Sequence, residues 1–168
     1  MITVEYCRMM ARYNAWQNRG LMDVMKSLKP AELTRDRKAF FGSILGTANH
    51  LLWGDRLWMS RLDGGFAPKE RLAESPQLHD TLQLYLDDRI RTDARISRWA
   101  AGLSQVGLIG PLTWHSTVQD RQMSKPMPIC VTHFFNHQTH HRGQIHAMLT
   151  AVGHTPGDTD LVFMPDGD

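Results

Sequence analysis

Histidine is the residue type in this sequence whose number and spacing indicate chemistry. The chain contains nine histidines, and four of them fall within the segment HFFNHQTHH at 133–141. On an α-helix, which turns about 100° per residue, His137 and His141 are four residues apart and therefore lie on one face. Two imidazoles at this spacing can reach a single ion, so the pair predicts part of a metal site.

A third ligand is expected from a neighbouring helix, since two side chains of one helix seldom hold an ion firmly. His50 fits this position because it lies inside a second helical segment, in NHLLWGD. The predicted metal ligands are thus His50, His137 and His141. Imidazole suits Zn, Ni or Fe, and we expect one divalent ion per chain. The helical wheel places Asp55 about 140° from His50, so this carboxylate is not expected to bind the ion.

A structural interpretation competes with the metal site. Paired histidines on a helix are often solvated or hydrogen-bonded core residues, and spacing alone leaves the two alternatives equally open. His133 and His140 fit supporting, core or surface positions better than direct binding. Residues that could orient an imidazole or an anionic substrate group are His133, Gln144 and Arg142, although an exposed or ion-paired Arg142 is equally expected.

Missing motifs argue against several other sites. A di-iron carboxylate bundle needs several inward glutamates with Glu-x-x-His pairs, whereas this sequence has glutamate only at 5, 32, 70 and 74. HExxH, GxSxG, paired CxxC motifs and a glycine-rich phosphate loop are absent. Cys7 and Cys130 lie far apart, so reduced thiols are expected. Cys130 precedes His137 by about 10 Å along a helix, which favours a buried small residue over a nucleophile.

Apolar residues at three- and four-residue steps predict four helices that position these side chains, over 6–28, 41–62, 76–101 and 129–152. Ser75-Pro76 is typical of an N-cap followed by proline at the first helical position, and Gly102 and Gly153 are expected to close the third and fourth helices. Between 106 and 127 the helical period disappears, which predicts two short strands or an extended excursion. Segment 31–38 is expected to be a polar connection, and segment 154–168 is expected to be irregular. The fold class is therefore all-α, a four-helix bundle with a hairpin excursion.

The second predicted helix is apolar on two sides. Gly46, Trp53 and Leu57 lie beside His50 on the helical wheel. A separate stripe occupies roughly the opposite side and consists of Ile44, Leu45, Ala48, Leu52 and Met59. We predict that this stripe forms the interface of a homodimer.

Length and composition set wider limits. The 168 residues, 42% of them hydrophobic, suffice for one sizeable core but not for two, so a single domain over 1–168 is expected. A net charge of +2, with arginines spread over every segment, argues against a nucleic-acid partner. No stretch has the roughly 18 apolar residues of a membrane span, and the first residues lack the apolar core of an export signal. We therefore expect a cytoplasmic protein with no membrane partner.

Segments along almost the whole chain resemble the DinB family: YNAWQNRGL at 13–21, FFGSILGTANHLLWGDRLWMSRL at 40–62, THFFNHQTHHRGQIHAMLTAVG at 132–153, and then PGDTDLVFMP. The motif HxxxHRGQ with a lone histidine on the second helix is specific to that family. The resemblance implies a DinB/YfiT-like four-helix bundle of up-down-down-up topology, often a homodimer. It also implies a metal bound by one histidine of the second helix and two of the fourth, which match His50, His137 and His141. Ala48 stands where relatives commonly have Leu, a change in packing volume only.

The resemblance also carries an expectation about activity. Better-understood relatives in the wider superfamily are thiol-dependent transferases and isomerases, in which the metal is thought to activate a low-molecular-weight thiol. Three histidines leave coordination positions open, which is the pattern of catalytic zinc sites. We therefore expect a small-molecule substrate and transfer of a small thiol, in preference to attack by water. The competing hypothesis is a non-enzymatic dimeric bundle whose metal is structural or sensory, and haem binding is a more distant alternative.

Overall fold

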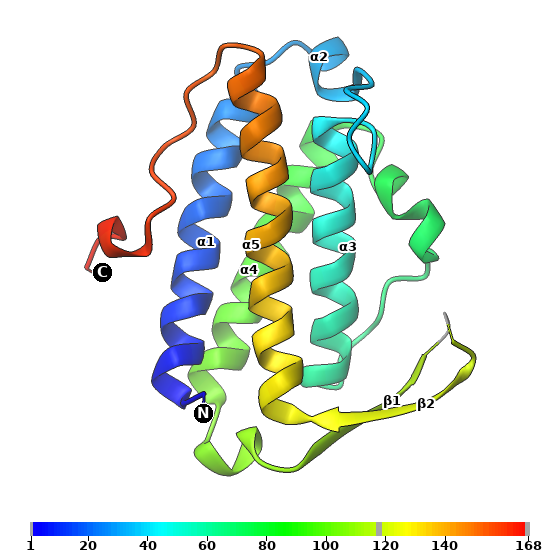
Figure 1. Ribbon diagram of the computed structural model, residues 1–168, viewed down its shortest axis with the longest axis vertical. Coiled ribbons are helices and arrows are strands. Elements are labelled where there is room, and N and C mark those ends of the chain that lie inside the picture. The colour runs from blue at the N-terminus through cyan, green and yellow to red at the C-terminus, as the bar shows by residue number, and fades with distance from the viewer. Residues whose placement is uncertain (1, 117–118, 167–168) are drawn as a thin grey trace.

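The computed structural model describes residues 2–116 and 119–166, and this part of the chain is mostly helical (Figure 1). Its α-helices are α1 (Val4–Lys26), α2 (Pro30–Thr34), α3 (Ile44–Leu62), α4 (Leu82–Gly102) and α5 (Met127–Ala151). The strands are β1 (Pro111–Ser116) and β2 (Arg121–Pro126), and the 3-10 helices are η1 (Leu72–Gln77), η2 (Gln105–Leu108) and η3 (Leu161–Phe163). The prediction of a mostly helical chain is confirmed.

The four long helices lie side by side, with α1 and α5 running in one direction and α3 and α4 in the other (Figure 1). α5 contacts both α1 and α3, and α4 contacts the same two helices. After α3 the chain returns along the length of the molecule before α4 begins (Figure 1). The helices of the described residues include none with the length and apolar character of a membrane-spanning segment.

The hairpin β1–β2 occupies the predicted excursion between α4 and α5. The two strands pair antiparallel, with Pro111 opposite Pro126 and Ser116 opposite Arg121. Trp114 of β1 packs edge-on against Trp58 of α3, with the ring centroids 5.6 Å apart. This contact attaches the hairpin to the C-terminal half of α3.

The interior consists of two apolar clusters with a polar layer between them. One cluster combines the second half of α1, the first half of α3 and the end of α5, and the other contains Met59, Ile96, Phe134 and Phe135. In each long helix, buried polar residues fall between the sequence ranges of the two clusters. They include Asn14, Asn18, Asp55, Arg89, Asp93, Gln138 and Arg142.

Arg89 of α4 is the centre of the polar layer. Its guanidinium pairs with Asp55 of α3 at 2.6 Å and with Asp93 one turn further along α4 at 2.7 Å. Asn18 of α1 donates to Asp93, and Gln138 of α5 donates to Asp55 at 3.0 Å, so all four long helices are joined. This position agrees with the expectation that Asp55 does not join His50.

The predicted start of the third helix at Ser75-Pro76 is wrong. Both residues belong to η1, and α4 begins only at Leu82, after an N-cap at Thr81. Asn49 of α3 donates to the carbonyl oxygens of Pro76 and His79, at 3.0 and 2.9 Å. These tertiary bonds engage two carbonyls that an α-helix would use internally, so the segment turns as a 3-10 helix against α3.

The predicted polar connection and the predicted irregular tail each contain a short helix. Pro30 at the first helical position starts the short helix α2, which lies within the connection between α1 and α3. The C-terminal segment contains η3 and runs along α1 (Figure 1). There the Tyr13 hydroxyl donates to the carbonyl of Thr159 at 2.5 Å, and Gln17 donates to that of Asp158 at 2.8 Å.

The apolar stripe on α3 is not a dimer interface, contrary to the prediction. Ile44, Ala48, Leu52 and Met59 are 0% exposed and Leu45 is 4% exposed within the single chain. The first four of these positions along α3 share a cluster with α1 and α4 residues such as Met25, Tyr85 and Leu86. The second apolar side of the helix therefore fills the core of its own chain.

Candidate metal centre

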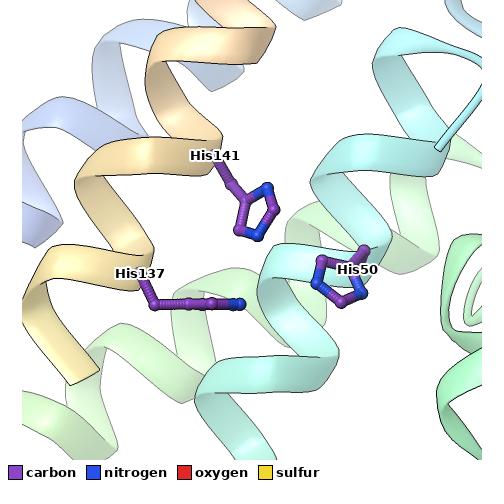
Figure 2. A group of neighbouring side chains, drawn as sticks. All are labelled: His50, His137 and His141. Atoms are coloured by element: carbon purple, nitrogen blue, oxygen red, sulfur yellow. The ribbon is translucent and has the colours of Figure 1, made fainter. Parts of the chain in front are cut away.

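α3 and α5 bring the three predicted histidines together. One ring nitrogen from each of His50, His137 and His141 can be chosen so that all three lie within 4.8 Å of one another. The rings of His137 and His141 project from α5 towards His50 on α3 (Figure 2). Their ring centroids are 4.4 Å apart, and His50 lies 4.7 Å from His141 and 5.5 Å from His137. This is the geometry of a group that could hold one metal ion.

Gly54, one turn after His50 on α3, provides the space for His137. A Cβ atom at this position would lie 2.7 Å from Cε1 of His137, closer than a real Cβ contact allows. Any larger residue would displace that imidazole. A glycine costs about 1 kcal/mol relative to alanine inside a helix, so its presence here is itself a signal of close approach.

The hydrogen bond between His50 and Ser75 determines which nitrogen of His50 is free. Nδ1 of His50 lies 2.8 Å from the Ser75 hydroxyl, and that hydroxyl donates its one hydrogen to the carbonyl of Leu72 at 2.7 Å. Ser75 must therefore accept from Nδ1–H, which leaves the lone pair of His50 on Nε2. Ser75 is fully buried, so this arrangement is shielded from competing water.

Gln144 performs the same task for His141. Its amide oxygen Oε1 accepts from Nδ1 of His141 at 2.8 Å, which again leaves Nε2 with the lone pair. The amide nitrogen of Gln144 lies 3.2 Å from Nε2 of His140. Gln144 thus reaches the imidazole that the sequence suggested it could orient, while His140 contacts Gln144 and lies outside the three-histidine group.

Aromatic side chains enclose His50. The Phe41 ring stacks on it at a centroid distance of 3.7 Å, and the Trp53 ring lies 5.9 Å away in a near-parallel orientation. The Trp53 indole N–H donates to the carbonyl of Glu70 at 2.9 Å. Phe41 also meets His141 edge-on at 5.5 Å. Two apolar rings therefore flank His50, and the Trp53 ring is held in place by its hydrogen bond to Glu70.

All three imidazoles have lowered pKa values. Burial, followed by the neighbouring His141, lowers the pKa of His50 to about 4. Burial, and after it the neighbouring imidazoles, lower the pKa of His137 to about 3. Burial also lowers the pKa of His141, against the opposing effect of its bond to Gln144. At neutral pH the three rings are thus uncharged, which is the form that binds metals.

His133 and Arg142, the other two residues suggested by the sequence, lie outside the three-histidine group. His133 packs between Trp58 and His137, at centroid distances of 4.9 and 5.8 Å, and burial and Arg61 lower its pKa. Arg142 contacts Asn14 and lies over the Tyr13 ring on the α1 side of α5, because neighbouring residues of a helix point about 100° apart. Its predicted role towards a substrate at the histidines is therefore not supported, and it is neither exposed nor paired with a described carboxylate.

Sequence reasoning missed Gly54, Ser75 and Phe41. Ser75 is 25 positions from His50 and carried a local signal only as a helix cap. Phe41 marked the start of a helix, and nothing in its spacing placed it over His50. Gly54 alone had a usable signal, as an unfavourable residue inside an apolar helix one turn after a predicted ligand.

Comparisons with known proteins extend over nearly all of the chain. The model described as "DinB family" matches residues 1–168. The chain is also similar to "Protein DinB" of Bacillus subtilis (strain 168), with 26% identity over 156 residues that cover 88% of this chain and 87% of that protein.

Proposed function

The chain belongs to the DinB family, and from this premise we propose that it binds one divalent metal ion through His50, His137 and His141 to activate a small thiol. The observation that carries the proposal is the convergence of three imidazole nitrogens from α3 and α5. The proposed metal is Zn, Ni or Fe, which imidazole ligands suit. The proposed reaction is transfer of the thiol to an electrophilic small molecule, and attack by activated water is the alternative reaction.

The donor set fits such an ion. All three imidazoles are neutral at pH 7, and His50 and His141 have Nδ1 engaged as a donor, so their Nε2 lone pairs are available. Ser75 and Gln144 act as supporting hydrogen-bond partners, which fix the orientation of a metal-binding imidazole and raise its basicity. The group contains no carboxylate or thiolate among the described residues, so the charge of an ion would not be neutralised by the protein.

The open coordination favours chemistry over a purely structural role. When bound, a divalent ion held by three imidazoles supplies a thiolate or hydroxide at neutral pH by lowering the pKa of its exogenous ligand. The protein residues hold the imidazoles in place, while Phe41 and Trp53 restrict access of water on the His50 side. In the transfer, the thiol loses its proton to solvent, the sulfur bonds to the electrophilic carbon, and the leaving group departs with the electron pair.

A thiol-consumption screen tests the proposed activity. Metal-loaded wild type would be incubated with common cellular thiols and electrophilic acceptors, beside His137→Ala and the matched control His140→Ala. We expect metal-dependent loss of free thiol in wild type and His140→Ala, and none in His137→Ala. Equal activity in His137→Ala would contradict the proposal. Metal that raises the melting temperature with no thiol consumed would instead support the non-enzymatic bundle with a structural or sensory metal.

The proposal extends to assembly and location. We propose that the four long helices form the up-down-down-up bundle of the family, and that the protein is a cytoplasmic homodimer. The dimer must use a surface other than the apolar stripe of α3, because that stripe is buried within one chain. Sedimentation equilibrium tests the dimer, and a monomer over the micromolar range would contradict it.

A further inference from the structure

A hollow lies on the other side of α5 from the histidines. It has a volume of about 340 Å³ and is enclosed by α1, α5 and the C-terminal residues 156–159; we call it the tail pocket. Tyr13, Trp16 and Gly20 line it from α1, and Arg142 and Gly143 from α5. Its size lies within the range of small-molecule sites.

The C-terminal wall of the tail pocket is anchored. Tyr13 and Gln17 hold the carbonyls of Thr159 and Asp158, and Arg12 donates to the carbonyl of Pro165 at 2.9 Å. Pro156 is buried against the rest of the chain. The hollow is therefore a formed part of the fold, with aromatic side chains on the α1 wall.

Arg142 brings to this pocket a guanidinium that no carboxylate of the described residues contacts directly. It is 4% exposed, and its guanidinium donates to two neutral oxygens, that of the Asn14 amide and, at 3.5 Å, that of the Thr139 hydroxyl. The second contact is at the limit of a hydrogen bond. The nearby carboxylates Asp55 and Asp93 form their ion pairs with Arg89 instead.

A buried guanidinium without a carboxylate partner is costly, and an anion entering the tail pocket would offset that cost. The planar fork of arginine matches a carboxylate with two parallel hydrogen bonds. The Trp16 ring, whose centroid lies 5.9 Å from that of Tyr13, offers a surface for a flat apolar body attached to that carboxylate, while the Arg142 guanidinium itself lies over the Tyr13 ring.

We propose that the tail pocket binds a small organic carboxylate, with its charged group on Arg142 and its apolar body against Trp16. The site is separate from the histidine group, because Arg142 and its neighbour His141 lie on different sides of α5. Binding therefore needs neither a metal nor the proposed thiol chemistry. His50→Ala is expected to bind the carboxylate as wild type does, whether or not the metal proposal holds.

Titration calorimetry with benzoate and phenylacetate tests the charged contact, with benzamide as the uncharged analogue of benzoate. We expect wild type to bind benzoate at least tenfold more tightly than benzamide, and Arg142→Gln to lose that preference. Equal affinities of wild type for benzoate and benzamide would overturn the proposal. So would the absence of saturable binding of both benzoate and phenylacetate at millimolar concentration.

Two glycine variants test where the carboxylate binds without altering the buried guanidinium of Arg142. Gly20 and Gly143 both line the pocket, and a Cβ at either meets no atom within 4 Å, so Gly20→Leu and Gly143→Leu can fill the space while improving helix propensity. The matched control is Gly102→Leu, which also has open space but lies at the end of α4. We expect melting temperatures at or above that of wild type in all three, and at least tenfold weaker benzoate binding in the first two only. Unchanged binding in Gly20→Leu and Gly143→Leu would place the ligand elsewhere and overturn the proposal.

Discussion

Each imidazole of the histidine group depends on a particular neighbour that is not itself a ligand. Ser75 fixes the tautomer of His50, Gln144 fixes that of His141, and Gly54 leaves room for His137. Because metal affinity depends on ring position to within a few tenths of an ångström, these neighbours are expected to matter almost as much as the ligands.

Gly54→Ala tests the geometry of the metal site separately from the stability of the fold. The new Cβ would lie 2.7 Å from the His137 ring, which must move, whereas alanine improves the helix by up to about 1 kcal/mol. We expect unchanged or higher stability with roughly tenfold to hundredfold weaker metal binding, measured by competition with a chromophoric chelator. Gly20→Ala, which meets no atom within 4 Å, is the control. Wild-type affinity in Gly54→Ala would show that His137 is not a ligand.

The lowered pKa values of His50 and His137 predict acid sensitivity of the metal-free protein. Their folded-state pKa values of about 4 and about 3 lie below the ordinary value of 6.5, so below pH 6.5 the unfolded chain binds protons that the folded chain does not. The stability that the two neutral imidazoles contribute is fully present above pH 6.5. It is lost progressively as the pH falls from 6.5 to the folded-state values. Each contributes a slope of up to about 1.4 kcal/mol per pH unit.

Urea denaturation in the presence of a chelator, between pH 7 and pH 4.5, measures this slope. His137→Gln should flatten the fall in the free energy of unfolding by about 1.4 kcal/mol per pH unit, because it removes one of the two groups. Asn136→Gln, at an exposed position of the same helix, removes no titratable group and should leave the slope unchanged. A wild-type slope in His137→Gln would mean that His137 titrates as an ordinary exposed histidine.

At the scale of elements, the helical period was sufficient to find α1, α3 and α5, because each buries one long side against its neighbours. It placed the ends only to within three residues, since the hydrogen bonds of Thr3 and Ser43 that start α1 and α3 are local details. The start of α4 was wrong because Asn49, 26 residues before Ser75, decides how that segment folds. A tertiary bond of this kind leaves no periodic signal in the sequence.

Asn49→Ala tests that tertiary attachment. The variant removes the two bonds to Pro76 and His79 and leaves their carbonyls without a donor, at a cost of about 1–3 kcal/mol. It also loosens η1, which carries Ser75, so weaker metal binding should accompany the lower stability. Hydrogen exchange of the η1 amides and chelator competition measure the two effects. Loss of stability without any change in metal affinity would show that Ser75 does not support His50.

At the scale of the whole molecule, the polar layer joins the four long helices through Arg89. Burial raises the pKa of the Asp55 and Asp93 carboxyls, and the Arg89 guanidinium between them lowers both pKa values against that effect. The sequence showed Arg89 and Asp93 only as scattered charges, because an i, i+4 pair on a helix is most often solvated. Their burial depends on the packing of all four helices.

Arg89→Leu should destabilise the protein more than any ligand substitution. It leaves Asp55 and Asp93 buried without their cation, and removing one partner of a buried pair costs about 3–5 kcal/mol. Arg91→Leu is the matched control, since the Arg91 side chain is 70% exposed and its ion pair with Asp88 is long at 3.9 Å. Chemical denaturation at pH 7 measures both. A loss below 1 kcal/mol in Arg89→Leu would contradict the structural importance of the polar layer.

The measurement that most directly tests the central claim is elemental analysis of protein purified without metal-affinity chromatography. Wild type would be compared with His50→Ala, His141→Ala and the control His140→Ala, which removes an imidazole beside His141 but outside the group. The three-histidine site predicts nearly one equivalent of Zn, Ni or Fe in wild type and His140→Ala, and none in the other two variants. No metal in wild type, even after equilibration with each of these ions, would contradict it and leave the histidines as packing residues.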